Sequence, residues 1–192
     1  MKKKLIIHPE DPSTEFLKSL YLNEEALTKN IGNAHLRRQL QNSDEIWLLG
    51  HGCGEFGLLD MKSRFGVLNI VGSQHVQFLR DKLVVGIFCN ANMFAERYGL
   101  TGLFTGMIIS EMQEALDWNI PATGDEIFDE NMYFANNLNY CIKYCNSLKE
   151  VPGMMRKHIR ENSSPLVRFN YESIFWIENG ETIEEDNPLH KD

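Results

Sequence analysis

Two side chains with complementary chemistry end the two most apolar stretches of the sequence. The stretch Ile46–Gly52 (IWLLGHG) carries His51, and the stretch Leu83–Ala91 (LVVGIFCNA) carries Cys89. A cysteine thiolate is a strong nucleophile, and a neighbouring imidazole can take its proton. Uninterrupted apolar runs are typical of strands covered on both faces, and in α/β sheets chemistry gathers past the carboxyl ends of such strands. The sequence therefore predicts a Cys/His site.

The residues around this pair predict the rest of the site. Gly52 has no Cβ, so a substrate carbonyl could approach the main chain there, and we expect the backbone N–H groups of Gly52 and Cys89 to stabilise an oxyanion. A helix that starts at Cys89 would lower the pKa of the thiol. Ser110 and Glu111 equally suit an ordinary solvated helix face. The residues expected to line a pocket at this edge are Cys53, Asn90, Asn92, Ser110 and Glu111.

Each of these residues also has a plainer interpretation. A cysteine at the end of a buried strand is commonly an inert core thiol, and a histidine after a strand is commonly a hydrogen-bonded loop residue. The order of the two blocks, their apolar lead-ins and Gly52 together favour a dyad. A zinc or iron site would have only three soft ligands, His51, Cys53 and Cys89, with no fourth marked by the sequence. We therefore expect no metal and no cofactor.

The length and composition indicate one domain. The 192 residues suffice for one sizeable core, and we assign residues 1–178 to a single α/β domain and 179–192 to a polar, acidic tail. The formal charge of −8 makes nucleic acid and anionic membranes poor partners. The short apolar stretch after Met1 predicts neither a signal peptide nor a membrane span. Four cysteines without an export signal predict reduced thiols in the cytoplasm.

The rest of the chain predicts strands that alternate with helices. This pattern is typical of an α/β fold with a mostly parallel sheet. The expected strands are Lys4–His8, the two apolar stretches, Leu100–Thr105 and a last strand or strand pair over Val167–Ile177, with a small hairpin over Gly57–Ile70. The expected helices begin at Asp11-Pro12, Ser73 and after Cys89 (to Tyr98, with Gly99 as a left-handed cap), and cover Ala34–Gln41, Met107–Trp118, Asp125–Leu148 and Met154–Arg160.

Two further cysteines share one face of the long expected helix. Cys141 and Cys145 are four residues apart, and no His, Asp or Glu falls on that stripe at ligand spacing. We interpret them as small core residues. His158 lies on a Lys/Arg-rich segment that is expected to face solvent.

The order of the two reactive residues carries a family resemblance. An apolar block that ends in His-Gly, followed by an apolar block that ends in Cys, resembles the caspase-like cysteine peptidases of clan CD. The resemblance implies a three-layer fold with a six-stranded, mostly parallel sheet flanked by helices, which the segments from Lys4 to about Trp118 accommodate. It also implies that His51 is the catalytic histidine, Gly52 its glycine and Cys89 the nucleophile. The implied reaction is hydrolysis of a peptide bond in a peptide or protein substrate.

Departures from the family pattern leave a second function open. Phe88 is bulky where family members have a small residue, and Asn90-Ala91-Asn92 follows the cysteine, so the chain could instead be an inactive caspase-like module that binds a peptide or protein. A glutamine-amidotransferase-like hydrolase is disfavoured because its histidine follows the cysteine in sequence. Nucleotide binding is disfavoured because Gly50-His51-Gly52-Cys53-Gly54 lacks both the third glycine and the P-loop lysine.

Overall fold

The protein is described by a computed structural model that covers residues 2–29, 32–54, 56–61 and 67–183. Its centre is a seven-stranded mixed sheet with the order β10-β9-β8-β7-β3-β1-β2. The strands β1 (Lys4–Ile7), β2 (Ala26–Leu27), β3 (Glu45–Leu49), β7 (Leu83–Ile87) and β8 (Thr101–Thr105) are parallel. β9 (Ile174–Glu178) and β10 (Glu181–Thr182) extend the sheet in antiparallel pairing. The expected α/β class with a mostly parallel sheet is confirmed.

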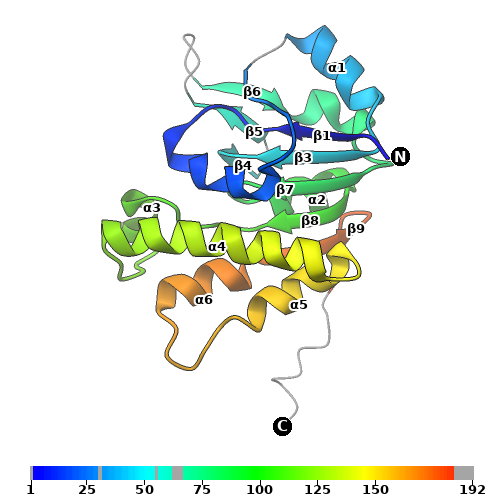
Figure 1. Ribbon diagram of the computed structural model, residues 1–192. Helices are drawn as coiled ribbons and strands as arrows, with labels where there is room; N and C mark the ends of the chain where they lie inside the picture. The colour runs from blue at the N-terminus through cyan, green and yellow to red at the C-terminus, as the bar shows by residue number, and fades with distance from the viewer. Residues whose placement is uncertain (1, 30–31, 55, 62–66, 184–192) are drawn as a thin grey trace.

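Helices cover both faces of this sheet, which makes three layers (Figure 1). One face is covered by α1 (Asn33–Gln41), the 3-10 helix η2 (Ser73–Phe78) and α2 (Ala91–Tyr98). The other is covered by the 3-10 helix η1 (Pro12–Tyr21), α4 (Gly124–Tyr144), α5 (Val151–Arg156) and α6 (Pro165–Glu172). The short helices α3 (Met112–Asp117) and η3 (Leu148–Glu150) complete the set in the described ranges.

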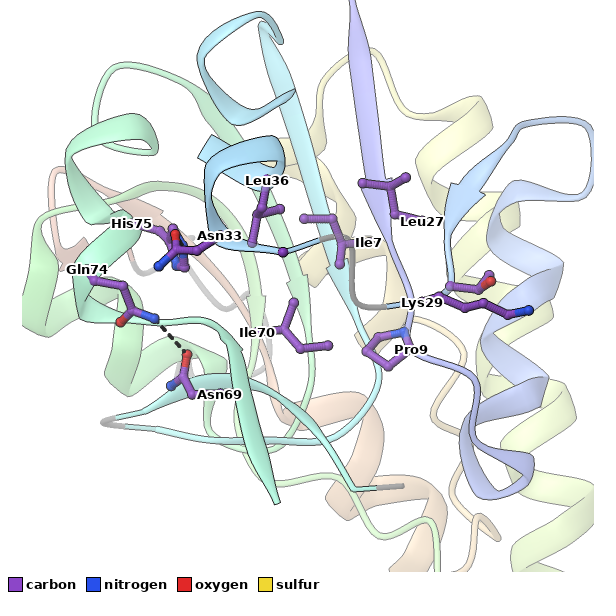
Figure 2. A pocket seen from close by; sticks show the side chains of 12 residues that line it. Ile7, Pro9, Leu27, Lys29, Asn33, Leu36, Asn69, Ile70, Gln74 and His75 are labelled. Carbon is purple, nitrogen blue, oxygen red and sulfur yellow. Dashed lines mark hydrogen bonds between the residues drawn. The ribbon is translucent and has the colours of Figure 1, made fainter. Parts of the chain in front are cut away.

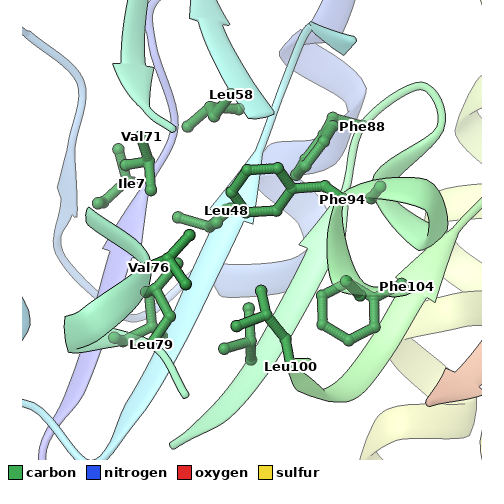
Figure 3. Close-up of a cluster of buried hydrophobic side chains, with 14 of the residues drawn as sticks. Ile7, Leu48, Leu58, Val71, Val76, Leu79, Phe88, Phe94, Leu100 and Phe104 are labelled. Carbon is green, nitrogen blue, oxygen red and sulfur yellow. The ribbon is translucent and has the colours of Figure 1, made fainter. Parts of the chain in front are cut away.

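The apolar strands contribute side chains to two separate cores, because successive side chains of a strand point to opposite faces of the sheet. In β3, Ile46 and Leu48 pack under α1, η2 and α2, whereas Trp47 and Leu49 pack under η1, α4 and α5. Figure 3 shows the first of these cores, in which Leu48 and Phe94 lie close together. Both faces of β3 are therefore buried, which explains why its sequence is a continuous apolar run.

A second, three-stranded sheet follows β3 directly. It consists of β4 (Gly52–Cys53), β5 (Gly57–Asp60) and β6 (Leu68–Val71) in antiparallel order β4-β5-β6. The hairpin expected over Gly57–Ile70 is present as β5 and β6, although residues 62–66 between them lie outside the described residues. Leu58 and Val71 anchor this sheet in the core under α2. It therefore sits beside the end of β3, next to His51.

Three segments differ from the sequence-based expectation. Met107–Trp118 is helical only from Met112 on. Val167–Ile177 is α6 followed by β9, because Ser164 caps a helix by accepting a hydrogen bond from Val167 N and Pro165 occupies the first helical position. These start signals outweigh the β-propensity of Val, Phe and Tyr. The tail expected over residues 179–192 begins inside the sheet, since Glu181–Thr182 pair with β9, while residues 184–192 lie outside the described residues.

Candidate active site

The pairing of β3 with β7 places His51 and Cys89 at neighbouring strand ends. Every residue of β3 is paired with the β7 residue 38 positions further along the chain, and His51 and Cys89 have this same separation. The main chains are still bonded just before His51, where Gly50 N donates to Ile87 O at 3.1 Å. The two residues therefore follow directly after the paired ends of neighbouring strands.

The His51 ring is oriented by a chain of hydrogen bonds from the start of η1. His51 Nε2 lies 2.7 Å from Ser13 Oγ, and Ser13 Oγ donates to Asp11 Oδ1 at 2.8 Å. A hydroxyl has a single proton, so a Ser13 hydroxyl that donates to Asp11 must accept from the Nε2–H of His51. This arrangement assigns the proton of a neutral imidazole to Nε2 and leaves Nδ1 with a lone pair for a substrate or a thiol.

The Cys89 thiol is directed toward Glu114 and away from a bond with the imidazole. Its Sγ atom lies 3.6 Å from Glu114 Oε1 and 3.7 Å from the carbonyl oxygen of Ile108. Within the described ranges, no hydrogen bond joins the Cys89 thiol to His51. Burial, and after it the negative charge of Glu114, raises the pKa of Cys89 from an ordinary 9.0 to about 12. In this arrangement the thiol is protonated at neutral pH.

Glu114 is held rigidly in this position. Its Oε2 atom accepts hydrogen bonds from Ser110 N at 2.7 Å, Ser110 Oγ at 3.0 Å and Glu111 N at 3.1 Å. These donors fix one carboxylate oxygen at the start of α3 and turn the other toward the thiol. The expectation of a lowered thiol pKa is therefore wrong for this arrangement, because burial and the charge of Glu114 raise the pKa of Cys89.

The two expected oxyanion donors, the N–H groups of Cys89 and Gly52, lie in different backbone environments. The N–H of Cys89 makes no hydrogen bond to any described residue. Gly52 lies in β4 and is paired with Leu58. A Cβ on Gly52 would overlap the ring of Phe88, so the glycine is explained by the packing of Phe88.

Phe88 itself is buried in the core under α2. Its ring packs edge-on against Phe94 at a centroid separation of 6.4 Å, and Figure 3 shows both rings within this core. The bulky residue before Cys89 therefore does not fill the space in front of the thiol. Gly52 makes room for it.

The other expected pocket residues are spread over three elements. Cys53 is exposed on β4. Asn90 has a left-handed backbone (φ 61°) between Cys89 and α2, a conformation that asparagine tolerates better than most residues. Asn92 is half-buried on α2, and its Oδ1 atom has no hydrogen-bond partner among the described residues. Ser110 and Glu111 precede α3 and belong to the network around Glu114.

Sequence reasoning missed three side chains that contact the pair. Asp11 was expected only as a helix cap, a role that it does have, since it accepts from Ser13 N at 3.0 Å. Neither Ser13 nor Glu114 carries a local signal for its second role. Glu111 and Glu114 do have the N-cap and N3 spacing of a capping box, which is the one sequence feature that could have drawn attention to Glu114.

A second Cys/His contact lies away from this site. Cys141 Sγ is 3.8 Å from His158 Nε2, and the His158 ring packs edge-on to Tyr171. The interpretation of Cys141 as a core residue is confirmed, since it is buried among the side chains under α4. The expectation that His158 faces solvent is wrong, because its ring is half-buried against Tyr171. Burial raises the pKa of Cys141 to about 11, so this thiol is poorly suited to nucleophilic attack.

Two pockets differ strongly in size. The larger has a volume of about 710 Å³ and lies between η1, the segment before α3 and the first half of α4. The smaller, of about 90 Å³, lies between β1, α1 and β6 (Figure 2). On its wall His75 Nε2 donates to Asn33 Oδ1 at 3.0 Å. The smaller pocket therefore has far less room for a peptide than the larger one.

The described residues form neither a metal-binding cluster nor a membrane-spanning helix. Among the described residues, no group of three or more His, Cys, Asp or Glu side chains is arranged to hold a metal ion. Within the same ranges, no helix combines the length and apolar character needed to cross a bilayer.

Comparison with known proteins gives no relative from which a function could be assigned, so the assignment rests on the geometry of the site. The chain matches no model of a known protein family, and no curated protein is similar to it in sequence.

Proposed function

We propose that the protein is a cysteine peptidase, or a related acyl hydrolase, with Cys89 as the nucleophile and His51 as the general base. The observation that supports this proposal is the register of β3 and β7, which pairs Leu49 with Ile87, each two residues before a reactive residue, at the carboxyl edge of a parallel sheet. A basic His51 Nδ1 and an unengaged N–H on Cys89 are the other two parts that acyl transfer needs.

The proposed reaction begins with rotation of the thiol. Cysteine has one side-chain torsion with three staggered positions, and one rotation takes Sγ away from Glu114. His51 Nδ1 then takes the thiol proton, and the thiolate attacks the substrate carbonyl. The N–H groups of Cys89 and Gly52 stabilise the oxyanion. His51 returns the proton to the leaving amine, which breaks the peptide bond, and then activates the water that hydrolyses the thioester.

The caspase-like assignment is part of this proposal. It is supported by the order His51-Gly52 before Cys89 and by a mostly parallel sheet with helices on both faces. The implied partner is a peptide or protein, with no role for nucleic acid given the charge of −8. We also propose a cytoplasmic location, because a nucleophilic thiol must stay reduced and Cys53, Cys89 and Cys141 are thiols.

The test is labelling of the intact protein with peptide acyloxymethyl ketones, followed by peptide mapping in a mass spectrometer. These probes need both a nucleophile and a substrate-like site. We expect Cys89 to be labelled faster than Cys141, and His51→Asn to reduce the rate by roughly a hundredfold or more. Equal labelling of Cys89 and Cys141, with no effect of His51→Asn, would refute the proposal.

A second candidate function is favoured by the contact between Cys89 and Glu114. A thiol with a pKa of about 12 that faces a fixed carboxylate is what an inactive, peptide-binding relative would retain. This candidate predicts that a peptide binds equally well to the wild type and to Cys89→Ala and that no peptide in a substrate library is cleaved. Turnover that disappears in Cys89→Ala would eliminate it.

A further inference from the structure

The larger pocket lies between η1, the segment before α3 and the first half of α4, on the face of the sheet covered by α4. In Figure 1 the start of α4 and the short helix α3 lie at the same end of the molecule, next to the blue N-terminal segment that contains η1. The pocket has a volume of about 710 Å³, within the range of roughly 300–1,000 Å³ typical of ligand sites. It is therefore large enough for a bulky side chain and part of the peptide that carries it.

Hydrogen bonds connect the walls of this pocket to both reactive residues. Ser13, which lines it, is the residue bonded to His51 Nε2 at 2.7 Å. Glu111, which also lines it, donates its N–H to Glu114, whose other oxygen lies 3.6 Å from Cys89 Sγ. One residue, Ser13, therefore links the pocket lining to the imidazole. Two residues, Glu111 and Glu114, link it to the thiol.

Exposed apolar side chains gather at the pocket from three separate elements. Leu22 follows η1 and is 75% exposed, and Phe128 on α4 is 68% exposed. Met112 on α3 and Met132 on α4 are also exposed large apolar residues on its lining. Apolar side chains that converge from different elements around one hollow indicate a binding site for apolar surface, whereas scattered ones need no explanation. Methionine in particular adapts to the shape of varied partners.

The charges on the lining argue against an acidic occupant. Glu15 and Lys18 form an ion pair with each other, so the one lysine on the lining is already neutralised. Glu111 has no ion-pair partner among the described residues, which leaves the lining with a net negative charge. A substrate carboxylate would be repelled here.

We propose that this pocket binds a large apolar side chain of the substrate, such as phenylalanine, leucine or methionine, on the residue whose carbonyl Cys89 attacks. The inference rests on the proposed peptidase function and adds its substrate class. Leu22, Met112, Phe128 and Met132 supply the contact surface.

The experiment compares acyloxymethyl ketones that differ only in the side chain next to the reactive carbon. Phenylalanine, leucine, arginine and aspartate probes react with the full-length protein, and the rate of Cys89 modification is measured by mass spectrometry. We expect the phenylalanine and leucine probes to react at least roughly tenfold faster than the other two, since apolar pockets discriminate by this order.

Matched variants test whether the preference for apolar probes arises in this pocket. Phe128→Ser and Met132→Ser remove apolar surface from the pocket, whereas Tyr133→Ser and Tyr140→Ser remove exposed aromatic side chains of α4 that are not on its lining. We expect the first two to reduce the ratio of the phenylalanine rate to the iodoacetamide rate by roughly tenfold and the last two to leave it unchanged. The ratio cancels any change in the reactivity of the thiol itself.

The outcomes separate the two proposals. Labelling of Cys89 that favours arginine or aspartate, or a phenylalanine preference that survives Phe128→Ser and Met132→Ser, leaves the peptidase function standing and overturns the pocket assignment. If no probe modifies Cys89 in the wild type, the proposed function fails and the substrate class falls with it.

Discussion

Replacing Glu114 with glutamine should make Cys89 more reactive. The carboxylate lies 3.6 Å from Sγ, and its charge is the second-largest cause, after burial, of the rise in the Cys89 pKa to about 12. Ser110 and Glu111 present three hydrogens to one side of this group, so the acceptor oxygen of a glutamine would face them and its NH₂ would face the thiol. The substitution therefore removes a negative charge and adds a donor, and both changes lower the pKa.

The expected size follows from two opposing effects. Lowering the pKa by one raises the thiolate population roughly tenfold at a pH below the pKa. The intrinsic nucleophilicity of the thiolate falls at the same time, with a Brønsted coefficient of roughly 0.4–0.5, so the net gain in alkylation rate is about threefold. Full return to the ordinary value of 9.0 would give a gain on the order of fiftyfold. Burial remains after the substitution, so we expect a value between these limits.

The assay is iodoacetamide alkylation of the folded protein between pH 7 and pH 10, read at each cysteine by mass spectrometry. Cys141 is the internal reference, because burial and Cys145, and not Glu114, raise its pKa. Glu111→Gln is the graded control, since its charge is the smallest cause of the raised Cys89 pKa, and it should have a weaker effect in the same direction. A folded Glu114→Gln protein whose Cys89 alkylates no faster than the wild type would refute the assignment of Glu114 as the group that restrains the thiol.

Three further predictions follow from single contacts. Ser13→Ala removes the acceptor of His51 Nε2, so peptide-probe labelling of Cys89 should fall by roughly tenfold to a hundredfold while iodoacetamide labelling changes little; equal loss with both reagents would contradict the orienting role. Gly52→Ala should lower the free energy of unfolding by about 1–3 kcal/mol because the methyl group meets the Phe88 ring, and urea denaturation should show that the same substitution costs less in a Phe88→Ala background than in the wild type. Burial raises the pKa of Glu130 from 4.5 to about 7, so the folded state retains a proton that the unfolded state releases, and stability must fall as the pH rises through this window. In thermal melts, the stability of Glu130→Gln relative to the wild type should therefore increase between pH 4.5 and pH 7, by up to ~3 kcal/mol. A difference in stability that does not change with pH would contradict the assignment.

Local sequence patterns predicted most of the sheet because its strands are buried on both faces. The run is apolar from Ile46 to Leu49 in β3 and throughout β7, since successive side chains such as Ile46 and Trp47 enter different cores. Gly99 was predicted as a left-handed helix cap and has a φ of 67°. The strand predicted over Val167–Ile177 is wrong over Val167–Glu172, where β-forming residues lie on a helix capped by Ser164, and is confirmed from Ile174, where β9 begins.

The sequence by itself determined that His51 and Cys89 end two buried strands, because strand ends are encoded by the residues of the strands themselves. Only the tertiary structure decided which partners these side chains have. Ser13 lies 38 residues from His51, and Glu114 lies 25 residues from Cys89, so no local periodicity relates them. The direction of the thiol, its raised pKa and the apolar pocket between η1 and α4 all depend on how separate elements pack. Side-chain chemistry could be read from the chain, whereas the protonation and orientation that govern its reactivity arise from contacts that form only on folding.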